Sequence, residues 1–174
     1  QRFYIPFFIG LIGNSLSIDN FFLFKIFTYI SLILIIYIQY LLILKSNCNF
    51  KTAFMFISLV ILNPYITRYF LSVPAMVNDV FFILGLHIFL YGLFQKNYLI
   101  FMGAIVSMIS RQTGIFVFFS CFFYLFQNKM LKLLIYNFLI FISIILLSIF
   151  YAKNSSISDF DFDHLFGLIK KIFI

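Results

Sequence analysis

The sequence predicts an all-α fold, a polytopic transmembrane helix bundle of about six segments, some of them short or re-entrant. Of the 174 residues, 64% are hydrophobic and only 10% are charged, whereas a soluble domain carries charge on about a quarter of its residues. The apolar residues form long stretches separated by short polar ones. Because the hydrocarbon interior holds no water, a segment inside it must satisfy its own backbone hydrogen bonds, and a helix does so.

The basic residues indicate the surroundings of the chain. The formal net charge is +7, but lysines and arginines stand singly or in pairs between apolar stretches. They do not line one polar face, so nucleic acid is not a predicted partner. The pattern is typical of loop charges that orient membrane spans. We therefore predict an integral, multi-pass membrane protein in contact with the lipid bilayer, in a bacterial plasma membrane or the endoplasmic reticulum.

The N-terminal segments differ in their capacity to span. Residues 2–13 are apolar but interrupted by a proline and two glycines, and they are too short to cross a bilayer. We expect them to lie in the interface or to re-enter the membrane. Residues 21–44 form the clearest span, with Lys25 near one end, where its side chain can reach the headgroups. A short polar loop at residues 45–51 follows.

The next apolar segments are shorter. Residues 53–66 and 80–94 are apolar, and a polar stretch that contains Arg68, Pro74, Asn78 and Asp79 separates them. Each is shorter than a typical span. We therefore expect short helices here.

The C-terminal part contains one segment of ordinary length. Residues 133–151 form a good span, and the stretch 153–163 after it is polar. Residues 165–174 are apolar with paired lysines, and we expect them in the interface.

Residues 98–126 allow two interpretations, because they form an almost unbroken apolar run with Arg111 at its middle. The run is either one long span or two short helices that meet near Arg111 in a hairpin. The hairpin places five lysines on one side of the membrane: Lys45, Lys51, Lys96, Lys129 and Lys132. It leaves Arg68, Arg111 and Lys153 on the other side with all five aspartates. The positive-inside rule favours the hairpin, with the lysine-bearing loops cytoplasmic.

Arg111 is the most informative residue for function. Placing a guanidinium in the middle of a membrane segment costs roughly 3 to more than 10 kcal/mol of free energy unless an anion or a hydrogen-bonding group contacts it. Gln112 and Thr113 add polar groups with defined geometry, and a guanidinium fork suits a phosphate better than an ammonium does. One hypothesis is a site at the outer face that binds an anionic lipid headgroup. The alternative is that Arg111 pairs with Asp79 or with backbone carbonyls and fixes helix packing.

Four other polar residues have structural explanations. Arg68 can reach the interface from a helix end. Asp79 can complement the helix dipole as an acid in the first turn, or it can contribute to a polar site beside Arg111. Asn78 can cap the same helix. His87 is expected to bond to a neighbouring helix.

No metal or cofactor is predicted. The aspartates at 159, 161 and 163 alternate with phenylalanines before His164, a pattern that fits a solvated loop better than a cation site. The cysteines Cys48 and Cys121 have neither the number nor the spacing of a disulfide framework or a metal motif.

A family resemblance begins at the arginine. The stretch Arg-Gln-Thr-Gly-Ile-Phe-Val at residues 111–117 resembles the Arg-Gln-Thr-Asn-Ile-aromatic motif of the endoplasmic-reticulum α-1,2-glucosyltransferases that use dolichyl-phosphate-glucose. These are GT-C glycosyltransferases with many membrane spans. The upstream order is also similar, with Asn-Pro-Tyr at residues 63–65 and then Asp79 at the entry of a span. The resemblance covers residues 2–126. Gly114 departs from it, standing where the family has Asn.

The resemblance implies transfer of a sugar from a polyisoprenyl-phosphate donor to an acceptor hydroxyl at the non-cytoplasmic face. It implies that Arg111 binds the lipid phosphate, that Gln112 and Thr113 orient it, and that Arg68 is a second candidate. The family carries its acidic motif in the first outer loop. We therefore expect residues 1–174 to be one transmembrane domain of a longer protein, with the first span and first outer loop upstream.

Two alternatives come from other functional classes. A transporter or flippase for a lipid-linked or anionic solute would use Arg68 and Arg111 to line its path, and it would be expected to contain paired repeats. No convincing repeat is visible. A purely structural membrane subunit would use Arg111 only as an internal ion-pair partner.

Overall fold

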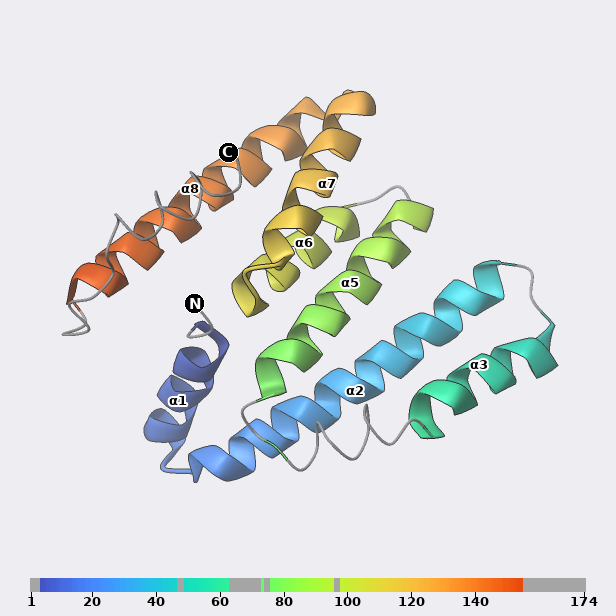
Figure 1. Ribbon diagram of the computed structural model, residues 1–174, viewed down its shortest axis with the longest axis horizontal. Coiled ribbons are helices and arrows are strands. Elements are labelled where there is room, and N and C mark those ends of the chain that lie inside the picture. The colour runs from blue at the N-terminus through green and yellow to red at the C-terminus, as the bar shows by residue number, and fades with distance from the viewer. Residues whose placement is uncertain (1–3, 47–48, 63–72, 74–75, 96–97, 155–174) are drawn as a thin grey trace, which may run out of the picture. The chain divides into compact units, whose positions relative to one another are not determined.

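The described part of the chain is entirely helical. The computed structural model describes residues 4–46, 49–62, 73, 76–95 and 98–154 (Figure 1), and these contain no strand. The helices are α1 (Tyr4–Leu16), α2 (Asn20–Lys45), α3 (Phe50–Leu62), α5 (Val77–Gln95), α6 (Leu99–Ser110), α7 (Gly114–Gln127) and α8 (Leu131–Asn154). The all-α prediction is confirmed for these residues.

Helix boundaries follow the apolar stretches closely. The span predicted at 21–44 is α2, and the segments predicted at 80–94 and 133–151 lie within α5 and α8. The long run at 98–126 consists of two helices, α6 and α7, which meet at residues 111–113. The two-helix alternative for this run is therefore the one the structure has.

Two of the described helices, α2 and α5, can cross a membrane by length and composition. At 1.5 Å per residue they are about 39 and 28 Å long, against a hydrocarbon thickness of about 30 Å. The other apolar helical stretches found in the described residues are shorter, with 10–17 residues each: Tyr4–Leu16, Leu99–Ser110, Gly114–Gln127 and Leu131–Leu147. The short segments expected from the sequence are present, and the number of membrane crossings stays a prediction.

The chain divides into two compact units, Gln1–Leu134 and Ile135–Ile174, with the boundary inside α8. The site described below lies in the first unit. The prediction of one transmembrane domain over residues 1–174 stays a prediction.

The first unit is held together at one end by a buried apolar cluster. Ile9 of α1 packs with Leu23 of α2 and Val77 of α5. One turn further on, the rings of Phe27 and Phe81 lie with their centroids 6.4 Å apart. The N-terminal ends of α2 and α5 are therefore at the same end of the unit, with α1 packed beside them.

Contacts farther along α2 and α5 show that the two helices run in the same direction. Ile35 of α2 packs against Leu84 of α5 in a second buried cluster. Near the C-terminal ends, the ammonium group of Lys45 lies 5.5 Å from the centroid of the Tyr91 ring. Between α2 and α5 in the sequence, α3 runs back alongside α2 and contacts it (Figure 1).

Small residues bring α5 and α6 into close antiparallel contact. A Cβ added to Gly85 would lie 2.6 Å from the backbone nitrogen of Ser107, and one added to Gly92 would overlap the backbone of Ile100. A Cβ on Gly103 would overlap the backbone of Phe89. Between apolar helices in lipid, association depends on such close packing. We call Gly85, Gly92, Gly103 and Ser107 the α5–α6 seam.

Two helices are followed by a residue other than glycine that has a left-handed backbone conformation. Ser17 has φ 54° and Lys129 has φ 55°. After α1 the amide of Ile18 donates to the carbonyl of Gly13, and after α7 the amide of Met130 donates to that of Leu125. Both are the hydrogen bonds of a Schellman motif, which satisfies a terminal carbonyl of the helix.

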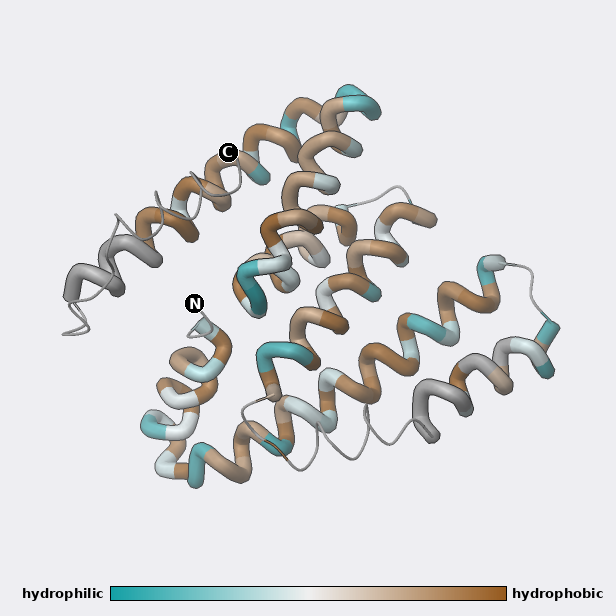
Figure 2. The backbone as a smooth tube through the Cα atoms, viewed as in Figure 1, coloured by the Kyte–Doolittle hydropathy of each residue, from teal (hydrophilic) through white to brown (hydrophobic). Residues whose placement is uncertain are grey.

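Polar residues gather mostly at helix ends (Figure 2). In the first unit the described acids, Asp19 and Asp79, lie at the N-terminal ends of the parallel helices α2 and α5. Lys45 ends α2 and Lys51 begins α3, so both lie at the opposite end. The described acids and these lysines are therefore separated along the helix axes.

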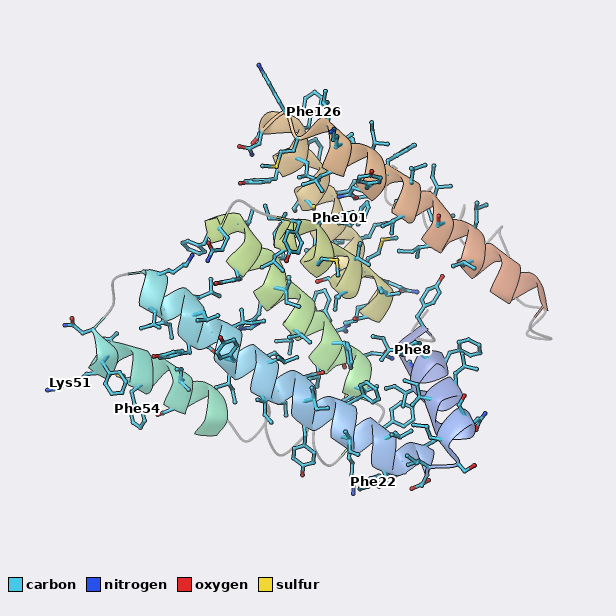
Figure 3. The ribbon with its side chains drawn as sticks, turned by 180° about the vertical axis from the view of Figure 1, so that it is seen from behind. Phe8, Phe22, Lys51, Phe54, Phe101 and Phe126 are labelled. Carbon is cyan, nitrogen blue, oxygen red and sulfur yellow. The ribbon has the colours of Figure 1, made fainter. Side chains whose placement is uncertain are left out.

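Much of the helix surface is apolar and open. Phe8, Phe22 and Phe54 stand out from α1, α2 and α3 (Figure 3), with 60%, 56% and 65% of their surfaces exposed. Many other large apolar side chains of the described helices are exposed as well, as expected for helices that contact a membrane or another protein.

Candidate site at the α6–α7 break

The break between α6 and α7 gives Arg111 its position. Helix α6 ends at Ser110, and Arg111 is extended, with φ −144° and ψ 150°. Its amide still donates to the carbonyl of Ser107 at 3.2 Å. Its own carbonyl accepts from the amide of Gly114 at 2.9 Å, which closes a tight turn before α7. The guanidinium is therefore carried by a fixed turn and not by the middle of a helix.

Gly114 permits this turn by its lack of a side chain. A Cβ at this position would overlap the carbonyl group of Ser107 and lie 2.6 Å from the nitrogen of Met108. The first turn of α7 thus crosses directly over the last turn of α6. This crossing gives a physical reason for the departure from the Asn of the motif that residues 111–117 resemble.

The guanidinium of Arg111 reaches back to the start of α5. Its Nε lies 3.1 Å from Oδ1 of Asp79, and its Cζ lies 5.8 Å from the centroid of the Phe82 ring. Asp79 and Phe82 are three residues apart on one helix, so they share a face. The ion pair between Arg111 and Asp79 is therefore present, and Phe82 adds a cation–π contact. Whether the pair only fixes helix packing or also serves a ligand site stays a prediction.

The burial of this pair is unequal. The side chain of Arg111 is 36% exposed and that of Asp79 is 14% exposed. The carboxylate contacts the guanidinium at Nε, the ring of Phe82 lies near Cζ, and part of the Arg111 side chain remains exposed. A guanidinium carries five donors in a planar fork, so it can bind a second anion without leaving its first partner.

Of the other predicted site residues, the structure describes Gln112 and Thr113 but not Arg68. Gln112 and Thr113 are exposed in the turn beside Arg111, and the hydroxyl of Thr113 makes no capping bond to α7. They lie at the accessible side of the site. Arg68 lies outside the described residues, as do the aspartates at 159, 161 and 163.

Two sequence-based expectations are corrected. Asn78 lies inside the first turn of α5, where it is buried, and it does not occupy the capping position. His87 does not bond to a neighbouring helix through Nδ1, because this atom lies 2.8 Å from the carbonyl oxygen of Ile83 in its own helix. Asp79 lies in the first turn of α5 as expected.

Apolar residues lie at the same end of the unit as the polar pair. The cluster of Ile9, Leu23 and Val77 there is buried, whereas Phe116 in the first turn of α7 is 72% exposed. A ligand that reaches Arg111 would therefore meet a cationic side chain close to an exposed apolar one. The described residues contain no group of three or more His, Cys, Asp or Glu side chains that could hold a metal ion.

Phe82 is a residue of the site that the sequence pattern did not indicate, and Gly114 was noted there only as a departure from the motif. Phe82 is one of many phenylalanines, and only its spacing of three from Asp79 could have singled it out. No protein-family model, curated protein or solved structure matches the chain.

Proposed function

We propose that this chain is part of a multi-pass membrane glycosyltransferase of the GT-C type that takes its sugar from a polyisoprenyl-phosphate donor. The single observation that carries the proposal is the partly exposed side chain of Arg111, held at a helix break that is followed by the exposed Phe116 in the first turn of α7. A guanidinium fork matches phosphate geometry. An anion with a long apolar chain would satisfy both features of the site.

The separation of charge along the helices supports an outer location for the site. Lys45 and Lys51 lie at one end, and Asp19, Lys25, Asp79 and Arg111 lie at the other. The hairpin topology predicted from the sequence adds Lys96, Lys129 and Lys132 to the Lys45 end. Cytoplasmic loops carry an excess of lysine and arginine. The Arg111 end would then face the non-cytoplasmic side, where the sugar transfer takes place.

In the proposed reaction an acceptor hydroxyl attacks the anomeric carbon of the donor sugar. A new carbon–oxygen bond forms while the bond from that carbon to the phosphate oxygen breaks, and the lipid phosphate leaves with the electron pair. A general base takes the hydroxyl proton; none of the described residues is assigned to it. Arg111 stabilises the charge that develops on the departing phosphate, and Gln112 and Thr113 orient it.

The proposal is tested in the full-length protein with Arg111→Ala and a sugar-transfer assay in native membranes. We expect loss of transfer with normal expression and membrane insertion. The matched control is Lys25→Ala, which removes a cation at the same end of α2, where its ammonium lies over the Phe21 ring. Normal turnover of Arg111→Ala would refute the proposal, and loss of the folded protein would support a packing role only.

A second candidate is a flippase or transporter for a lipid-linked anionic solute. The observation that favours it is the pair of short helices α6 and α7, about 18 and 21 Å long, with polar residues at their break. Broken helices of this kind form the solute sites of many transporters. Movement of a lipid-linked solute in proteoliposomes without chemical change would identify this function.

A further inference from the structure

We infer that Asp79 shifts the selectivity of the Arg111 site away from a phosphomonoester and toward a phosphodiester headgroup, and so weakens the binding of the lipid phosphate that transfer releases relative to the sugar donor. This inference rests on the proposed function and names a role for Asp79 within it. Asp79 would be a specificity-determining residue that acts on the ligand through space.

The geometry places one negative charge beside any ligand of Arg111. Oδ1 of Asp79 lies 3.1 Å from Nε of the guanidinium, and the carboxylate is mostly buried. A phosphate on the accessible part of the same guanidinium would lie within the distance of about 8 Å over which physiological salt screens charges. The ion pair has no net charge, so the site attracts an anion mainly through short-range hydrogen bonds.

The chemistry of the reaction changes the ligand's charge. A donor with its phosphate esterified on both sides carries one negative charge. When the sugar leaves, the phosphate becomes a monoester, which carries roughly −1.5 to −2 at pH 7 because its second proton dissociates near pH 6. Arg111 attracts the second charge of the monoester and Asp79 repels it. The carboxylate thereby offsets the gain in affinity that the guanidinium alone would give the product.

The test uses two lipids with the same acyl chains in mixed micelles of a neutral detergent. Phosphatidylglycerol supplies the diester and phosphatidic acid the monoester, and binding to the full chain is measured for each. We expect Asp79→Asn to raise the affinity for the monoester relative to the diester about ten-fold over the wild type. Asp19→Asn is the matched control, because Asp19 is an exposed cap at the same end of α2.

The outcomes separate this inference from the proposed function. If Arg111→Gln abolishes binding of both lipids but Asp79→Asn leaves the preference unchanged, the selectivity inference is wrong and the phosphate site stands. If Arg111→Gln changes the affinity for neither lipid, the proposed function is wrong and the inference is wrong with it.

A measurement on the wild type keeps the test independent of how Asp79→Asn folds. Between pH 8 and pH 5 phosphatidic acid loses its second charge. Its affinity relative to phosphatidylglycerol should change little, because the attraction of that charge by Arg111 and its repulsion by Asp79 offset each other. Phosphatidylglycerol keeps one charge and serves as the reference for any other effect of pH. The titratable and charged groups on the neighbouring elements are Asp19 and Lys25 on α2, Arg111 after α6 and His87 on α5; α1 carries no charged residue. A relative affinity that falls steeply from pH 8 to pH 5 would overturn the inference.

Discussion

Gly85 of α5 lies against Ser107 of α6, so closely that a Cβ on the glycine would be 2.5 Å from the serine hydroxyl oxygen. This contact lies on the same pair of helices that bring Asp79 and Arg111 together. The α5–α6 seam therefore determines whether the guanidinium reaches its carboxylate. The packing of Gly85 on Ser107 and the ion pair of Asp79 with Arg111 are therefore linked through helices α5 and α6.

The first prediction concerns this seam. Gly103→Ala should destabilise the protein by about 1–3 kcal/mol, because the new methyl group meets the backbone of Phe89 and overpacking costs that much. Gly10→Ala is the control, since nothing lies within 4 Å of a Cβ at Gly10. Thermal unfolding in detergent, followed by helical circular dichroism, measures both. Equal stability of the two variants would contradict the close packing.

The second prediction concerns the corner after α1. Ser17→Gly should be neutral or stabilising, because Ser17 is left-handed at φ 54° and an L-residue there costs about 1–2 kcal/mol. Ser15→Gly, two residues earlier inside α1, should cost about 0.5–1 kcal/mol, as glycine does in a helix. The same unfolding assay compares them. If Ser17→Gly is the more damaging of the two, the corner is not as described.

The third prediction concerns orientation. In a background without Cys48 and Cys121, Gln112→Cys should react with a membrane-impermeant thiol reagent from the non-cytoplasmic side. Ser46→Cys, at the end of α2, should react only after the membrane is permeabilised. Reaction of both from the same side would contradict the charge-based orientation and remove Arg111 from the outer face.

The fourth prediction concerns Phe82. Phe82→Leu should weaken binding of an anionic lipid about two- to five-fold, because a cation–π contact at a partly exposed site contributes about 0.5–1 kcal/mol and here helps to hold the guanidinium. Phe94→Leu is the matched control, since Phe94 is an exposed residue near the other end of α5. Equal affinities of the two variants would show that Phe82 does not position Arg111.

The sequence predicts the helices well because each apolar stretch has polar ends. The span at 21–44 matches α2 within one residue at each end. The break at Arg111 was also predictable, because a charge in the middle of a 29-residue apolar run has to reach a polar region. Local composition is sufficient for features of this kind.

Lateral packing was not predictable in the same way. Almost every face of these helices is apolar, so periodicity does not indicate that Leu84 meets Ile35 or that α2 and α5 run parallel. Ser17 and Lys129 have a backbone conformation that glycine usually adopts, so neither turn could be recognised from its residue type. The pair of Asp79 and Arg111 could be named only as an alternative, because its formation depends on the α5–α6 seam.

The most direct test of the central claim, that Arg111 binds a lipid phosphate, is photocrosslinking with a photoreactive polyisoprenyl phosphate. The full-length protein in lipid nanodiscs is crosslinked and the modified peptides are identified by mass spectrometry. We predict adducts around residues 111–113 and on α1, lost in Arg111→Gln but retained in Lys25→Gln. Adducts confined to the Lys45 and Lys51 end, or unchanged by Arg111→Gln, would contradict the account.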